Sequence, residues 1–243
     1  NNAGTFTSLG DVRDATVFDN TINSSGTSTF NNSGTYVQNS GALATTIGVA
    51  FNNTGTLNAQ SGRVTLGGGG TSSGTFTSSA GAVIEFSGGS HTINTGTIAG
   101  AGTVRVSGGT TTLANTASYT GTGTLELTGG TLNVQGTAGP PGPGLLRMTN
   151  GTLGGTDTLS AGSFELAGVS ATMRDAGTTT ITGAAALGDG TAGSNRLALE
   201  SGRVLNLNGA STFQGQVISL TNATLNNAGT FTSLGDVRDA TVF

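Results

Sequence analysis

The chain of 243 residues contains no cysteine, no tryptophan and no lysine, and it has a single histidine. Without cysteine, neither a disulfide framework nor a thiolate metal site can form. Charged residues make up only 8% of the chain, and the net charge is −4. A nucleic-acid-binding protein normally carries a clustered basic face, so we expect no nucleic acid among the partners.

Long apolar runs are also missing. No stretch reaches the roughly 18 apolar residues that a transmembrane helix needs, so we expect no membrane span in this segment. The sequence does not begin with methionine or a signal peptide, and we expect any targeting information to lie outside it.

Glycine, threonine, serine and asparagine are abundant, with 44 glycines. Such a composition can indicate disorder. Against this, the 34% of apolar residues recur in short alternating runs, which is typical of β-strands.

One three-residue pattern, apolar then exposed then apolar, recurs about every 20 residues. Its copies are Val64-Thr65-Leu66, Ile84-Glu85-Phe86, Val104-Arg105-Val106, Leu125-Glu126-Leu127, Leu146-Arg147-Met148 and Phe164-Glu165-Leu166. A constant period combined with alternation predicts a solenoid in which short strands stack coil upon coil.

The central residues of five consecutive copies alternate in charge. They are Glu85, Arg105, Glu126, Arg147 and Glu165. Stacked strands lie about 4.8 Å apart, so each charge would lie between two of the opposite sign. We predict a structural charge ladder that fixes the register, since a slip by one coil would oppose like charges. The alternative is that these are merely solvated residues on unrelated strands.

Two further patterns mark the bends of each coil. A Gly-Thr pair followed by an apolar residue, often after two asparagines, recurs at Gly34, Gly55, Gly74 and Gly96. Gly-Gly pairs follow the charged strands at residues 88–89, 108–109 and 129–130. Glycine and asparagine accommodate sharp corners, and we expect the asparagines to form hydrogen-bonded ladders. The sequence therefore predicts an all-β, parallel β-solenoid, a right-handed β-helix with about three short strands per coil of about 20 residues.

Residues 1–18 reappear letter for letter as residues 226–243. We therefore predict one repeat unit, residues 1–225, followed by the start of an identical repeat at 226–243. At about 20 residues per coil the unit would contain roughly 11 coils. The duplicated acidic and basic residues would form a salt-bridged repeat junction, with a cation site on the paired carboxylates as the alternative: Asp11, Arg13, Asp14, Asp236, Arg238 and Asp239.

Two segments interrupt the pattern. All three prolines lie between Gly139 and Gly144, where they predict an outward loop, because proline cannot donate to a central strand ladder. Residues 167–196 keep the spacing less well, so the register is least defined there.

Catalytic and metal-binding patterns are sparse. His91 follows a Gly-Gly-Ser bend, and we expect it to be a solvent-facing turn residue rather than a catalytic base. The ladder carboxylates would each be neutralised by flanking arginines instead of acting as acid and base. Gly188-Asp189-Gly190 occurs once and lacks the repeated calcium-binding pattern. We expect no enzyme, no cofactor and no metal site.

These Asn-x-Gly-Thr corners, Gly-Gly bends and apolar-charge-apolar strands resemble the β-solenoid repeats of filamentous-haemagglutinin-like adhesins and autotransporter passenger domains of bacteria. The resemblance implies export to the cell surface or the extracellular space, a long rod, and a role in attachment, aggregation or sheath and biofilm formation.

From the sequence we therefore expect an extracellular structural filament protein made of head-to-tail repeats, whose main partner is itself, with possible bundling of fibres. The alternatives are a carbohydrate- or surface-binding adhesin module, whose partners would be cell-surface glycans or other surfaces, and a polysaccharide-cleaving β-helix enzyme.

Overall fold

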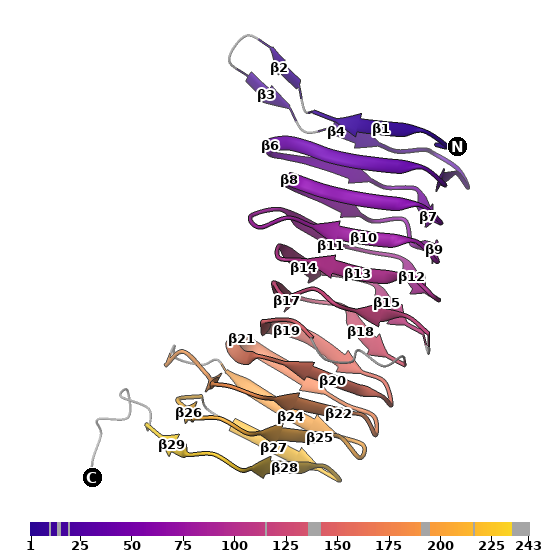
Figure 1. Ribbon diagram of the computed structural model, residues 1–243. Coiled ribbons are helices and arrows are strands. Elements are labelled where there is room, and N and C mark those ends of the chain that lie inside the picture. The colour runs from indigo at the N-terminus through magenta and orange to yellow at the C-terminus, as the bar shows by residue number, and fades with distance from the viewer. Residues whose placement is uncertain are drawn as a thin grey trace.

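The structure is a computed structural model. It describes residues 1–234 except 10, 14–15, 19, 115, 136–141, 191–194 and 216, and it leaves the side chains of 11–13 and 16–18 undescribed. The described residues form strands, bends and turns and contain no helix. The strands stack in parallel into a rod of about ten turns (Figure 1), so the predicted all-β parallel solenoid is confirmed.

Each turn passes through three faces in a fixed order. Strands of the first face are β1 (Thr5–Ser8), the start of β6 (Thr35–Ile47), the start of β8 (Thr56–Leu66), β10 (Thr75–Ser78), β13 (Thr97–Gly100), β16 (Ser118–Tyr119), β20 (Thr158–Ala161), β22 (Thr178–Ile181), β25 (Val204–Leu207) and β28 (Thr224–Asn227).

The second face follows. Its strands are β4 (Asn20–Ile22), the ends of β6 and β8, β11 (Val83–Phe86), β14 (Thr103–Val106), β17 (Thr124–Leu127), the starts of β19 (Leu145–Gly154) and β21 (Ser163–Met173), β23 (Ala185–Leu187), β26 (Ser211–Phe213) and β29 (Phe231–Ser233).

The third face completes the turn. Its strands are β5 (Thr29–Asn32), β7 (Ala50–Asn53), β9 (Gly70–Ser72), β12 (Ser90–Ile93), β15 (Thr110–Leu113), β18 (Thr131–Val134), the ends of β19 and β21, β24 (Arg196–Glu200) and β27 (Val217–Thr221). A separate antiparallel pair joins β2 (Asp11–Arg13) to β3 (Thr16–Phe18).

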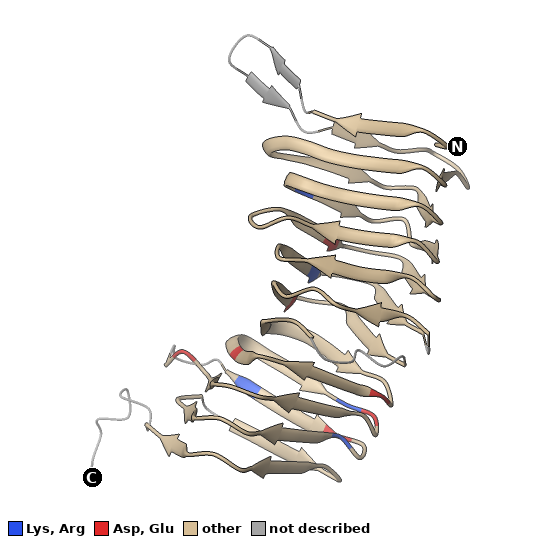
Figure 2. Cartoon of the chain, in the orientation of Figure 1, with Lys and Arg blue, Asp and Glu red and all other residues tan. Residues whose placement is uncertain are grey.

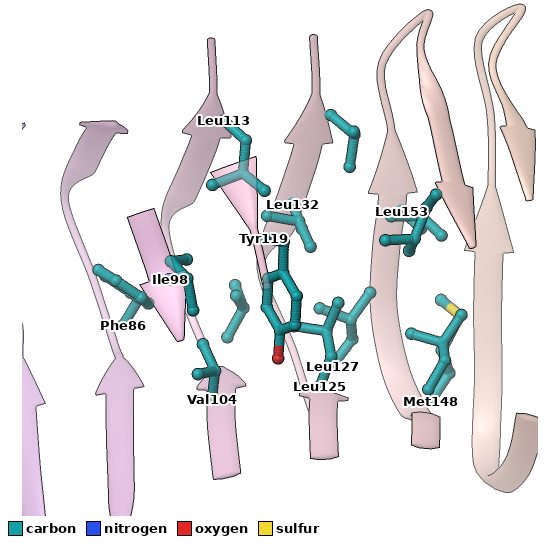
Figure 3. Close-up of a cluster of buried hydrophobic side chains, with 14 of the residues drawn as sticks. Phe86, Ile98, Val104, Leu113, Tyr119, Leu125, Leu127, Leu132, Met148 and Leu153 are labelled. Atoms are coloured by element: carbon teal, nitrogen blue, oxygen red, sulfur yellow. The ribbon is translucent and has the colours of Figure 1, made fainter. Parts of the chain in front are cut away.

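The core is a continuous column of side chains inside the rod. Along most strands, buried residues alternate with more exposed ones, as in β14 and β18. The buried residues of successive coils stack directly, as Leu125 lies in register with Val104 and Leu146. Figure 3 shows Tyr119 among leucines and valines from neighbouring coils. Because each coil buries its apolar residues against the coils on either side, stability depends on adjacent coils.

The corners bring backbones unusually close together. Glycines stack at the corner before the first face, where a Cβ on Gly55 would lie 2.0 Å from the carbonyl oxygen of Gly34. One coil later, a Cβ on Gly74 would lie 2.1 Å from the carbonyl oxygen of Gly55. No side chain fits at these two positions, which explains the Gly-Thr pattern of the sequence. Around the predicted proline loop, Gly142 and Pro143 lie outside strands, and residues 136–141 lie outside the described part of the chain.

Candidate functional site

The five ladder residues lie in one row on the second face. Strand pairing places Glu85 beside Arg105, Arg105 beside Glu126, Glu126 beside Arg147, and Arg147 beside Glu165. Figure 2 shows positive and negative residues alternating from coil to coil in this part of the rod. Within each of these coils the residue before and the residue after the charge are buried, so the period-2 alternation points the charges away from the core.

Every neighbouring pair in the row forms an ion pair. The nitrogen–oxygen distances are 4.0 Å for Arg105–Glu85, 2.7 Å for Arg105–Glu126, 3.6 Å for Arg147–Glu126 and 3.5 Å for Arg147–Glu165. The side chains of Glu85 and Glu126 are only 10% exposed, whereas that of Arg147 is 40% exposed. Each of these two shielded carboxylates is therefore covered by two arginines. This arrangement neutralises the charge of both carboxylates within the row.

The ladder is one residue longer than the sequence pattern indicated. Arg63 lies 3.3 Å from Glu85 although the strand partner of Glu85 is Thr65. Arg63 precedes Thr65 by two residues on the same strand, so it reaches Glu85 diagonally. Beyond Glu165 the row continues with Ala186, where the alternation of charge ends.

Reversing one ladder charge tests its energetic role. In a Glu126→Arg variant the row would hold three consecutive arginines, so two ion pairs become two repulsions. We expect a loss of about 2 kcal/mol, against about 1 kcal/mol for Glu126→Gln, which removes the pairs without adding repulsion. Thermal unfolding followed by circular dichroism would measure both variants. Equal losses would show that the row contributes no electrostatic selection of register.

His91 is buried, so its prediction as a solvent-facing turn residue was wrong. It lies on β12 with 4% exposure, its Nε2–H donates to the carbonyl oxygen of Leu66 at 3.2 Å, and its ring forms a T-shaped pair with that of Phe86, with the centroids 5.0 Å apart. The strand register explains the position, because His91 stands beside Thr111, which in turn stands beside the core residue Leu132. Burial lowers the pKa of His91 below 6.5, and hydrogen bonds to backbone carbonyls oppose this only in part.

The buried histidine predicts a pH dependence of stability. A lowered pKa in the folded chain means that the unfolded chain binds the proton more readily, so stability is complete above about pH 6.5 and falls as the pH drops below it. We expect the midpoint of thermal unfolding to decrease between pH 7.5 and pH 5.5. Because the chain has only one histidine, the His91→Leu variant should show a flat profile. A parent protein with an equally flat profile would contradict this.

Arg203 is a fully buried cation that the sequence did not single out. Its Nη1 donates to the carbonyl oxygens of Gly155 and Arg174, both at 3.3 Å, and its Nη2 donates to Thr179 Oγ1 at 2.5 Å. Burial lowers the pKa of Arg203 to about 10, and the negative charge of Asp175 opposes that shift. Two carbonyl oxygens and one hydroxyl therefore accept from this guanidinium, whereas its buried Nε has no hydrogen-bond partner, and Arg203 forms a polar centre inside the rod.

The predicted asparagine ladders are confirmed at the corners. On the outer side, Asn31 donates to Asn1 at 3.0 Å and Asn52 donates to Asn31 at 2.9 Å. On the inner side, Asn2 donates to Asn32 at 2.7 Å, and Asn32 donates to Asn53 at 2.8 Å. A further outer pair lies near the other end of the rod, where Asn226 donates to Asn206 at 2.9 Å.

The predicted junction residues are mostly not described. Asp11 and Arg13 lie on β2, but their side chains are undescribed, and Asp14, Asp236, Arg238 and Asp239 lie outside the described residues. The salt-bridged junction therefore stays a prediction.

A hollow lies at the N-terminal end of the rod. It measures about 490 Å³ and is lined by Asn1, Phe6, Ile22, Phe30 and Val49, among others. Another hollow, of about 290 Å³, lies beside Pro143 and Gly162. Among the described residues, no group of three or more histidine, aspartate or glutamate side chains could hold a metal ion. Within the same part of the chain, no helix has the length and apolar character needed to cross a membrane.

The elements that the structure brings together are thus an ion-pair ladder, asparagine ladders and stacked glycines, all of which bind one coil to the next. Searches for known relatives add nothing to this list, because no family model, no curated protein and no solved structure matches the chain.

Proposed function

We propose that this chain is a structural filament protein, in which identical 225-residue units follow one another head to tail as one long β-solenoid. One observation carries the proposal: residues 1–18 recur as residues 226–243 in a chain that winds as a rod of stacked coils. A segment that recurs along such a rod marks the beginning of the next unit.

The edges of the end coils support this proposal. A parallel sheet presents unpaired N–H and C=O groups at its first and last strand, and such an edge recruits another strand unless it is covered. Large apolar residues are exposed in the end coils, with Phe6 at 43%, Leu220 at 50% and Phe231 at 37%. A following or preceding unit would cover both edges and these side chains.

The chemistry of the described surface fits a mechanical role. Six of its charged residues, from Arg63 to Glu165, form ion pairs between neighbouring coils, and these pairs contribute to cohesion along the rod. We propose an extracellular or cell-surface location and a role in attachment, aggregation or sheath formation. In such a role, many weak contacts along one fibre together give a high overall affinity for a surface.

Electron microscopy of a tandem protein with three units would test the filament. About ten turns per unit, at about 4.8 Å per turn, predict unbranched rods that lengthen by about 50 Å with each added unit. The single chain serves as the length control. Collapsed particles, or beads joined by flexible links, would contradict the proposal.

The adhesin alternative makes a different prediction. If the hollow beside Pro143 were a carbohydrate site, the single chain would bind selected glycans on an array, and substitutions at Pro143 would remove that binding. Binding spread evenly over the array, or none, favours the scaffold.

A further inference from the structure

The two copies of the recurring segment lie on different faces of the rod. Residues 5–8 form β1 on the first face, whereas their identical counterparts include β29, Phe231–Ser233, on the second face. Asn2 pairs with Asn32 of the third face, whereas Asn227 pairs with Leu207 of the first face. Both parts of the segment are therefore displaced by one face in the same direction.

This displacement follows from the number of turns in the repeat. The second face holds eleven stacked strands from β4 to β29, which are ten complete turns. The step from β1 on the first face to β4 on the second adds one more face. The offset of 225 residues between the two copies therefore spans ten turns and one third.

The described parts of the two copies have similar local structure. Both copies have a strand at the Phe-Thr-Ser sequence and a bend at the preceding glycine. The copy at 226–234 bonds to the coil before it: Ala228 donates to Leu207, and Thr230 accepts from Ser211. The copy at 1–9 forms its backbone hydrogen bonds to the coil after it, and it does so at different positions of the segment.

In the copy at 1–9, the backbone N–H of Asn2 donates to the carbonyl oxygen of Asn31, and the carbonyl oxygen of Gly4 accepts from the N–H of Thr35. The residues that bond backward and those that bond forward thus alternate along the segment. A single coil with this sequence can therefore pair with β25 and β26 on one side and with β5 and β6 on the other.

Side chains of the two half-environments also complement each other. Phe231 contacts Phe213 with ring centroids 6.3 Å apart, and its counterpart Phe6 contacts Phe30 at 5.9 Å and Tyr36 at 5.4 Å. When the copies are merged, one phenylalanine ring lies among all three aromatic residues. The ring is 43% exposed in the first copy and 37% exposed in the second, and in the merged coil it would have a neighbouring coil on each side.

The outer asparagine ladder runs in one direction through the merged coil. Asn226 donates to Asn206 of the preceding coil, while its counterpart Asn1 accepts from Asn31 of the following coil. On both sides of the junction, the asparagine of the later coil thus donates to that of the earlier coil. In the merged coil a single asparagine side chain would donate through its Nδ2 to the preceding coil and accept through its Oδ1 from the following coil.

We propose that successive repeats join through this shared coil and are rotated by one face, so that the fibre is a three-fold screw of 225-residue units. The first face of one repeat continues as the third face of the next, and the second continues as the first. The same face is restored after three repeats, which are about 31 coils and about 150 Å. This inference rests on the proposed function and identifies the partner surface as another copy of the repeat.

The rotation distributes the ion-pair ladder around the fibre. Within one unit the ladder lies on the second face only. In the fibre it would occupy each of the three sides in turn, so that any surface lying along the fibre meets the ladder once in three repeats.

A tandem protein in which residues 1–225 are followed by residues 1–243 allows a direct test. The chain has no cysteine, so introduced pairs can be spin-labelled specifically. Thr212 pairs with Thr232, whose counterpart Thr7 pairs with Val37. The proposal therefore places Thr212 of the first unit two coils, about 10 Å, below Val37 of the second. Both point outward from their strands, so labels should not disturb the core.

The matched control pair is Thr212 of the first unit with Thr46 of the second, because Thr46 lies outward on the second face of its own unit. We expect dipolar broadening of the electron paramagnetic resonance spectrum for the Thr212→Cys and Val37→Cys pair, and none for the control pair. Broadening in the control pair alone would mean a whole number of turns per repeat and would overturn the one-face rotation.

Absence of broadening in both pairs would also overturn the shared coil. Rods in electron micrographs of the same tandem protein would then still support the filament, so the two proposals can fail separately. Single-cysteine variants with unchanged circular dichroism would show that each substitution is tolerated.

Discussion

A Gly55→Ala variant is expected to lose about 3 kcal/mol or more of stability. The added methyl carbon would lie 2.0 Å from the carbonyl oxygen of Gly34, which is far inside van der Waals contact. Relief requires the two coils to move apart, yet that same carbonyl accepts a hydrogen bond from Thr56 at 2.9 Å. The substitution therefore opposes the backbone ladder itself, and thermal unfolding followed by circular dichroism would measure the loss.

Gly26 provides the matched control for this substitution. A Cβ at Gly26 meets no atom within 4 Å, and its φ angle lies outside the left-handed region. We expect Gly26→Ala to change stability by less than about 0.5 kcal/mol. If the two variants unfolded at the same temperature, close stacking at the corners would not be what requires glycine there.

Arg203→Ala is expected to cost about 3 kcal/mol or more, because truncation removes a buried side chain and leaves its hydrogen-bond acceptors unsatisfied. The acceptors are the carbonyl oxygens of Gly155 and Arg174 and the hydroxyl of Thr179. Arg203→Met fills similar volume without a charge, so it should lose less than the alanine variant. Urea denaturation of the three proteins would measure these differences.

Arg63 is the natural comparison, because both arginines stand in the sequence Ser-Gly-Arg-Val. The Arg63 side chain is 44% exposed and pairs with Glu85 at 3.3 Å. An ion pair of this kind contributes little, so Arg63→Ala should cost less than about 1 kcal/mol. Similar losses at the two positions would contradict the assignment of Arg203 as a buried polar centre.

The sequence predicted the fold where its period was regular. From residue 64 to residue 166 the apolar pairs around each charge fixed both strand position and inward direction, and the pairing of Glu85, Arg105 and Glu126 follows that spacing. The signal was strong because burial, alternation and opposite charge all indicate the same register.

The buried polar residues could not be predicted in the same way. His91 was assigned from the bend before it, whereas the coil-to-coil alignment with Thr111 and Leu132 decides its direction. Arg203 and Arg63 have the same flanking residues in the sequence, but the valines that follow them differ in burial: Val64 is buried and Val204 is only half-buried. The strand phase is thus shifted by one residue, and a local sequence match carries no information on that phase.

The number of turns also differed from expectation. A period of about 20 residues, taken from the most regular coils, predicted roughly 11 turns, whereas the strands form about ten. Some coils are longer: strands of the second face begin at Ser163, Ala185 and Ser211, so the later turns contain more residues. Loop length within a coil is weakly constrained, because loops lie outside the stacked strands.

The direction of the backbone hydrogen bonds has a mechanical consequence. Parallel pairing from coil to coil places these bonds along the length of the rod, so tension between its ends loads the coils in series. The outermost coil then detaches first, and every detached coil releases about 20 residues, or roughly 70 Å of extended chain, for about 4.8 Å of rod. A fibre built in this way would yield to a pull by lengthening many-fold at a nearly constant low force, instead of resisting until it breaks.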